Sequence, residues 1–254
     1  MAIEKNIAEI NIFLYFCDSL IFKKHFMKKS FLLFISVLFT AYSVAQETQV
    51  NSSSERNLPR FTISANIGPA WRTDGIPDAI YDGERDFYKD LTSGYQMNIA
   101  GDYFFSDNYG IRLAYQRFSS TADLSPNGQT LLTGEIAMNV VYPAFVARFA
   151  TKNQKWLFDG SVGVGYIDDW ETGNSGVLNQ TFEANGSAIC GQFTLGAQYF
   201  ITKELGIGIN FTYTGGSLSA DNTDFEGVPI TIDDNEKTSL NHIGLLFGLR
   251  YHIR

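Results

Sequence analysis

From Arg60 onward, apolar and polar side chains alternate with a period of two, which is typical of β-strands whose two faces meet different surroundings. In the clearest segment, residues 61–71, the odd positions are apolar and the even positions are mostly small or polar. The alternation predicts seven further strands, at residues 95–103, 111–116, 136–150, 156–166, 189–199, 205–213 and 243–253. The apolar positions change phase within 136–150, so we expect a β-bulge at Val140–Val141.

The connections between these strands alternate in length. Short connections lie at 106–109, 151–154 and 201–204, and long ones at 73–93, 119–135, 168–186 and about 217–240. Short turns at one end and long loops at the other are typical of an up-and-down barrel. The sequence therefore predicts an all-β fold, an eight-stranded antiparallel barrel over residues 60–254, with no second folded domain.

Alternation alone does not say whether the apolar face points into the barrel, as in soluble lipocalin-like barrels, or outward, as in membrane barrels. The apolar face carries no charged or amide side chain in the regular strands, and the opposite face is mostly Gly, Ser, Thr, Asn and Gln. Aromatic residues also gather near strand ends on the apolar face, as in the girdles of membrane barrels: Trp71, Tyr95, Tyr103, Trp156, Tyr166, Tyr199, Tyr213 and Tyr251. These features predict a transmembrane β-barrel.

The N-terminal region has the order of a secretory signal. A basic start at Met27 is followed by an apolar run and by small residues up to Ala45. We expect residues 27–45 to be a signal peptide cleaved between Ala45 and Gln46. Residues 1–26 do not fit a signal's basic region and are interpreted as a miscalled upstream extension, and the polar residues 46–59 as a flexible leader.

With this signal, the eight strands and the closing strand from His242 to Arg254, the chain resembles the porin-like outer membrane protein β-barrel domain family of Gram-negative bacteria. The resemblance covers residues 60–254. It implies an outer-membrane location with periplasmic termini, a monomer, and the membrane lipids, surface glycolipid and barrel assembly machinery as partners. Such barrels commonly end in an aromatic residue that the assembly machinery reads; here Tyr251 and Ile253 would have to serve.

Five charged residues fall on the inward face in the half that the resemblance places nearest the periplasm: Asp102, Arg112, Arg148, Asp159 and Arg250. Because Asp102 and Arg112 flank one short turn, and Arg148 and Asp159 flank the next, each pair lies nearly opposite on neighbouring strands. The sharper interpretation is a salt-bridged plug that blocks a pore; the plainer one is that solvated side chains fill space. We favour the plug, because an eight-stranded barrel is narrow enough for side chains to fill.

Composition removes several function classes. A net charge of −8 argues against nucleic acid as a partner. The two cysteines, Cys17 and Cys190, form no CxxC motif, so neither a disulfide framework nor a Cys-rich zinc site is expected, and no cofactor is predicted. The long connections hold most of the acidic residues, which suits divalent-cation bridging to glycolipid phosphates or, more simply, solubility, because no calcium-loop spacing is present.

Catalysis has little support. Some small outer-membrane barrels modify lipid A with a His, a Ser and a carboxylate. Here His242 lies inward at the extracellular rim near Ser239, His252 lies at the opposite end, and Cys190 is read as lumen filler. No nucleophile–base–orienter set is visible. We predict a non-enzymatic outer-membrane barrel acting in membrane integrity or surface interaction through its acidic loops, with a narrow diffusion channel and then a lipid A-modifying enzyme as alternatives.

Overall fold

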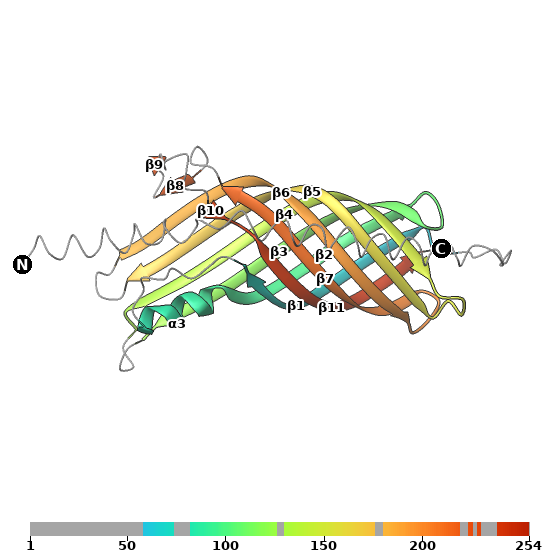
Figure 1. Cartoon of the computed structure of the whole chain (residues 1–254), viewed down its shortest axis with the longest axis horizontal. Helices are drawn as coiled ribbons and strands as arrows, with labels where there is room; N and C mark the ends of the chain where they lie inside the picture. The colour runs from blue at the N-terminus through green and yellow to red at the C-terminus, as the bar shows by residue number, and fades with distance from the viewer. Residues whose placement is uncertain are drawn as a thin grey trace, which may run out of the picture. The chain divides into compact units, whose positions relative to one another are not determined.

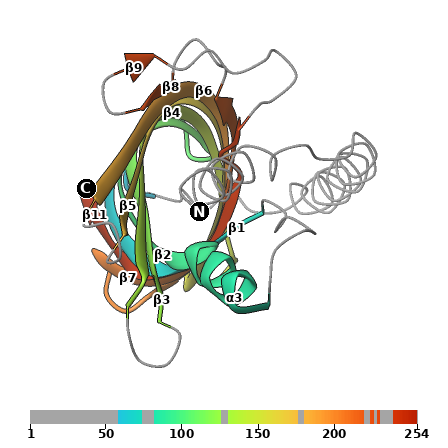
Figure 2. The same cartoon turned by 90° about the vertical axis from the view of Figure 1, so that its left-hand side faces the viewer.

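The computed structural model describes residues 58–73, 82–125, 130–175, 180–218, 223–225, 228–229 and 238–253. Eight long strands form a closed antiparallel meander, seen from the side in Figure 1 and along the barrel in Figure 2. They are β1 (Phe61–Arg72), β2 (Ser93–Phe104), β3 (Tyr109–Leu124), β4 (Leu132–Ala150), β5 (Trp156–Ser175), β6 (Gln180–Phe200), β7 (Leu205–Leu218) and β11 (His242–Ile253). The predicted fold class, strand order and short turns are confirmed.

The ring closes between the first and last strands. Residues Phe61 to Arg72 of β1 pair with Ile253 to His242 of β11, and β11 in turn pairs with β7. Each of the eight strands therefore has a partner on both sides, and the barrel itself has no free edge, which a bilayer requires. The three short turns and the end of β11 lie together at the right-hand end of the barrel in Figure 1. In bacterial outer-membrane barrels, short turns face the periplasm.

The apolar face points outward. In β1, Ile63 and Ile67 are 52% and 58% exposed, whereas Thr62 and Ser64, on the opposite face, are each 4% exposed. The same inversion runs around the ring, with buried amides, hydroxyls and ion pairs inside and exposed aliphatic and aromatic side chains outside. A soluble barrel would place these faces the other way round, so the membrane interpretation is confirmed and the lipocalin-like alternative is excluded.

Strands β3 to β6 extend far beyond their predicted ends. The ladder between β3 and β4 continues to Leu124 and Leu132, and the ladder between β5 and β6 to Ser175 and Gln180. The predicted long loops 119–135 and 168–186 are therefore mostly strand, which corrects the sequence interpretation. Above the membrane the outer face is polar as well, so the apolar alternation that marks a strand is lost although the backbone pairing continues.

The predicted bulge at Val140–Val141 is wrong. The register of β4 with β3 and with β5 is constant on both sides of this position, so no extra residue is inserted. The phase of hydrophobicity changes because Ile136, Met138 and Val140 point inward and are buried in the lumen, while Phe145 and Phe149 point outward. The sequence pattern therefore looks like a one-residue shift because the inward residues are apolar in this part of the barrel.

The first long connection contains the helix α3 (Asp82–Leu91), which sequence reasoning missed. Lys89 in its last turn suits the helix dipole, and Thr92 ends the helix by donating to the Lys89 carbonyl oxygen at 2.8 Å. The last long connection contributes the short strands β8 (Thr223–Phe225), β9 (Val228–Pro229) and β10 (Thr238–Ser239). Within the described ranges, no helix is long and apolar enough to cross a membrane.

Candidate functional site

The barrel lumen holds a buried cluster of four charged side chains, here called the central ion cluster: Asp102, Arg112, Asp159 and Arg250. Arg112 donates from Nε and Nη2 to the two carboxylate oxygens of Asp102, at 2.6 and 2.9 Å. Its Nη2 also donates to Asp159 at 3.1 Å, across the intervening strand β4. Arg250 reaches Asp159 from β11 on the other side. Two positive and two negative charges thus neutralise one another across the lumen.

Arg148 does not pair as the sequence suggested. It lies opposite Asp159 in the β4–β5 register, but its Nε donates to the Asp107 carbonyl oxygen at 2.9 Å, and its guanidinium carbon lies 3.5 Å from the centre of the Phe104 ring. Within the described chain, the ion pairs of Asp159 are with Arg112 and Arg250. The sequence could place Arg148 and Asp159 on facing strands, but it could not show that arginines from non-neighbouring strands would compete for the same carboxylate.

Polar layers lie on both sides of the central ion cluster. Toward the short turns, His252 contacts Thr62 through Nδ1 at 3.0 Å and Gln198 through Nε2. Toward the long loops, Asn210 donates to Asn66 at 2.8 Å, Asn66 donates to Asn98 and Asn98 donates to the Tyr142 hydroxyl. The bonds from Asn210 to Asn66 and from Asn98 to Tyr142, and the contact of His252 with Gln198, each span one intervening strand, whereas the other two join neighbouring strands.

A layer of glutamines and threonines follows. Gln116 on β3 donates to Thr214 on β7 at 2.9 Å and contacts His242 Nε2 at the same distance. Strands β3 and β7 lie on opposite sides of the ring, with three strands between them in either direction. Gln96 likewise reaches Thr212 at 2.9 Å. His242 is therefore a buried member of a cross-barrel network, and its Nδ1 contacts the Leu240 carbonyl oxygen at 3.1 Å.

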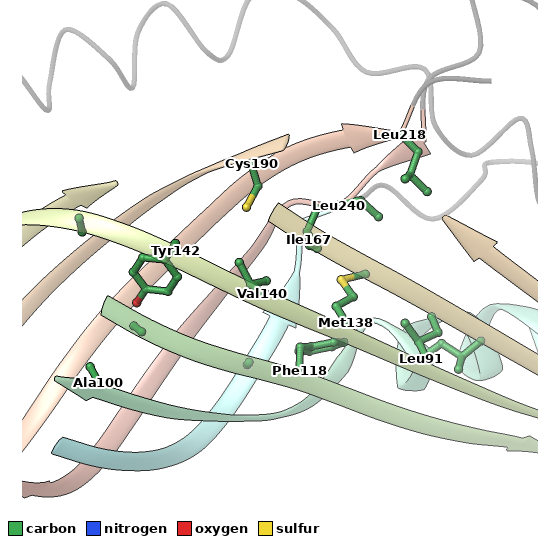
Figure 3. Close-up of a cluster of buried hydrophobic side chains, with 14 of the residues drawn as sticks. Leu91, Ala100, Phe118, Met138, Val140, Tyr142, Ile167, Cys190, Leu218 and Leu240 are labelled. Carbon is green, nitrogen blue, oxygen red and sulfur yellow. The ribbon is translucent and has the colours of Figure 1, made fainter. Parts of the chain in front are cut away.

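The extracellular half of the lumen is filled by a buried apolar cluster, shown in Figure 3. Phe118, Met138 and Ile167 come from the neighbouring strands β3, β4 and β5, Leu240 precedes β11, and all four are fully buried. Helix α3 adds Phe87 and Leu91, and its end is fixed to β3 by the Ser120 hydroxyl, which donates to the Leu91 carbonyl oxygen at 2.7 Å. Alternation missed this cluster, because the inward face was expected to be polar throughout.

An ion pair crosses the mouth of the barrel beside the apolar cluster, since Glu171 is the register partner of Ile136 in that cluster. Arg72 on β1 donates to Glu171 on β5 at 3.0 Å, and a second guanidinium nitrogen donates to the Ser239 carbonyl oxygen at 3.3 Å. Strands β1 and β5 are also opposite one another in the ring. The bond from Gln116 to Thr214 and the ion pair of Arg72 with Glu171 thus connect opposite walls, and the remaining polar bonds and the apolar cluster fill the lumen between them.

The remaining predicted residues occupy the following places. All eight aromatic residues predicted for the girdle lie on outward positions, and seven of them are exposed by more than a third. Cys190 is a buried free thiol inside the barrel. Among the described residues, no group of His, Cys, Asp and Glu could hold a metal ion. The proposed cleavage site at Ala45 and Gln46 and the N-terminal segments lie outside the described residues.

A closed ring of strands with an apolar exterior and a filled polar interior defines the class: a small transmembrane β-barrel. The family model "Outer membrane protein beta-barrel domain" matches residues 32–251, and the chain belongs to this family. It is accordingly a small outer-membrane β-barrel protein. No curated protein matches the chain.

Solved structures of other small barrels are similar in fold. A major outer membrane protein from Thermus thermophilus is 12% identical with a TM-score of 0.48, over 76% of this chain and 98% of that one. Ail, the attachment invasion locus protein of Yersinia pestis, is 14% identical with a TM-score of 0.44, over 77% and 99%. Neisserial surface protein A is 12% identical with a TM-score of 0.44, over 76% and 97%. The family assignment rests on the sequence match to the family model.

Proposed function

We propose that this protein is a closed, non-enzymatic and monomeric barrel that serves the integrity of the outer membrane and surface interaction, rather than passage through its lumen. The observation that carries the proposal is the central ion cluster, in which Asp159 forms ion pairs with Arg112 on β3 and with Arg250 on β11. A carboxylate fixed from two sides has to lose at least one partner before a solute can pass. The glutamine layer and the apolar cluster also fill the lumen with side chains and so block it at other positions along the barrel.

The environment of the two inward histidines supports the non-enzymatic role. His242 is enclosed by Gln116, Leu240 and the Phe118 ring, whose centre lies 5.4 Å from that of the imidazole. The nearest hydroxyl partner of His252 is Thr62, inside the barrel near its periplasmic end, and an amide occupies its other ring nitrogen. Lipid chemistry needs a nucleophile and base open to the membrane surface, whereas these groups are buried in the lumen.

The acidic loops are the proposed contact region. Parts of the predicted loops form the extended strands, where Asp123, Glu135, Asp168 and Glu183 take outward positions. Most of the other acids fall in ranges outside the described side chains. A negative outer rim suits divalent cations that link the protein to phosphates of the surface glycolipid. At the opposite end of the barrel, Tyr251 and Ile253 point outward, as a signal for the assembly machinery requires.

Conductance in planar bilayers tests the closed lumen. The wild type should show no steady current, whereas Asp102→Ala with Arg112→Ala should conduct, because this change removes bulk from the lumen. It also removes both partners of one ion pair, so no uncompensated charge is left from that pair, while Asp159 keeps Arg250. Thr121→Ala, outward and exposed on β3, is the matched control. Folding is checked by the heat-dependent gel shift of a closed barrel.

A wild type that conducts steadily, with the same current in the folded double variant, would replace this proposal with the diffusion-channel alternative. Hydrolysis or acyl transfer on lipid A by the purified protein, lost on His242→Ala, would replace it with the enzyme alternative.

A further inference from the structure

The outer surface of the barrel strands carries one basic side chain, Arg117, among the outward positions that the structure describes. All other arginines of the eight strands lie on the inward face, and the described lysines lie in α3 and in the short turns. A cation on a surface that faces lipid is costly unless it lies at the polar interface. The position of Arg117 along the membrane normal therefore decides whether its charge faces hydrocarbon or the polar interface.

The sheet register places Arg117 at the boundary between apolar and polar surface. Tyr115, one outward position nearer the short turns, is aligned with Val141 and Tyr166, which are exposed and apolar or aromatic. Arg117 itself is aligned with Asn139 and Asp168, so its row is the first polar one on β3 to β5. Arg117 thus lies between the row of Tyr115 and Tyr166 and a further row that holds Tyr95 and Trp170, a level typical of the membrane interface.

Two hydrogen bonds orient the guanidinium. Its Nε donates to the Ser119 hydroxyl at 3.4 Å, farther toward the extracellular end of the same strand, and its Nη1 donates to the Asn139 amide oxygen at 3.3 Å. The Tyr115 hydroxyl donates to the same amide oxygen at 2.7 Å and fixes it in place. The charged end of Arg117 is therefore drawn away from the hydrocarbon region, as expected for a side chain that snorkels to the interface.

The residues around the guanidinium suit a sugar that carries a phosphate. The next row upward aligns Tyr95, Ser119, Ala137 and Trp170, so two small residues lie between two exposed aromatic ones. Aromatic rings bind the apolar faces of sugars, and arginine binds phosphate in a forked geometry. Asp168 lies two strands from Arg117, about 10 Å away at the usual strand spacing, so it repels an anion from the far side of Asn139.

We propose that Arg117 is the anchor of a specific binding site for a phosphorylated glycolipid of the outer leaflet, with Tyr95 and Trp170 flanking its sugar. The site deepens the proposed role in membrane integrity and rests on it only for the orientation of the barrel. It does not depend on whether the lumen conducts. The acidic rim around it makes Arg117 the position at which a lipid phosphate can bind directly, without a bridging cation.

The test measures binding of bisphosphorylated lipid A to the folded protein in phosphatidylcholine nanodiscs, with chelator present, by native mass spectrometry. Arg117→Ala should weaken the affinity about tenfold, the usual effect of losing one charge-assisted hydrogen bond. Arg117→Lys should restore part of it, because the charge is kept but the forked geometry is lost. Thr121→Ala, on the same face of β3, should bind as the wild type does.

Equal affinity of Arg117→Ala and the wild type would overturn the proposal, as would equal binding of lipid A from which the phosphates have been removed. Equal binding of phosphatidylglycerol would overturn the assignment to a glycolipid. Conductance of the same preparations separates the two proposals. A conducting wild type that still binds lipid A through Arg117 contradicts only the closed lumen, whereas a silent wild type that binds no lipid A contradicts only this site.

Discussion

Gly196 on β6 leaves the space that Asp159 occupies. A Cβ atom placed on Gly196 would lie 2.5 Å from Oδ1 of Asp159, and within 2.6 Å of the Arg250 guanidinium and of the Asn210 amide oxygen. Asp159 and Arg250 belong to the central ion cluster, and Arg250 also donates to the Asn210 amide oxygen. The glycine is thus part of the site although it contributes no side chain to it.

Gly196→Ala should therefore destabilise the barrel by about 1–3 kcal/mol, the usual cost of overpacking a close-packed interior. Gly101→Ala is the matched control, since a Cβ there meets no atom within 4 Å. Urea unfolding of both variants in lipid vesicles measures the free energies of unfolding. Equal stability of the two variants would mean that the ion cluster can move aside freely.

Asp159 should be the most sensitive member of the cluster. Asp159→Ala leaves Arg250 without its ion pair and Arg112 with Asp102 alone, so we expect a loss of about 3–5 kcal/mol in the free energy of unfolding. Arg148→Ala should cost less, because Arg148 bonds a backbone carbonyl and packs on Phe104 rather than pairing with a carboxylate. The same unfolding measurement ranks the two, and the reverse ranking would contradict the assigned pairing.

The sequence was sufficient for the barrel because its evidence is local. Alternation between successive residues, such as Ile63 and Ser64, reports the two faces of a strand, and the short turns report which strands are neighbours. Together they predicted the strand order, the outward apolar face and the contact between Asp102 and Arg112, which are register partners.

Contacts across the ring could not be predicted in the same way. They depend on which side chains from distant strands reach the same level of the lumen, as Arg112 and Arg250 do at Asp159. Neither the strand alternation nor the turn lengths carry that information. The inward residues of β4 also led to a wrong prediction. Met138 and Val140 are apolar, as lipid-facing residues are, but they pack inside the barrel.

Processing is predicted from the N-terminal pattern. If the signal is cleaved after Ala45, intact-mass measurement of protein extracted from outer membranes should give a chain that begins at Gln46. Ala45→Arg should slow the cleavage, because signal peptidases read a small residue at this position. A mature chain that still begins at Met1 or Met27 would contradict the cleavage.

Substitutions on the two faces should differ in kind. Ile209 and Leu245 are outward and aligned with membrane-facing neighbours, so Ile209→Arg or Leu245→Arg should cost about 2–4 kcal/mol of folding free energy in bilayers. Thr212, on β7 but inward, accepts a hydrogen bond from Gln96. Thr212→Val should lose only about 1 kcal/mol. Refolding yields and urea titrations in vesicles give the comparison, and harmless arginines on the outer face would contradict the membrane orientation.

The mouth of the barrel should be closed independently of its centre. Arg72 also bonds the Ser239 carbonyl oxygen, so Arg72→Ala alone removes more than the contact with Glu171. A double-mutant cycle with Glu171→Ala isolates the ion pair, for which we expect a coupling of about 1 kcal/mol that weakens in concentrated salt. In planar bilayers the double variant should remain silent, because the central ion cluster and the glutamine layer still close the lumen below. Steady current in this variant, with the central residues intact, would show that the ion pair at the mouth, and not the central ion cluster, blocks the lumen.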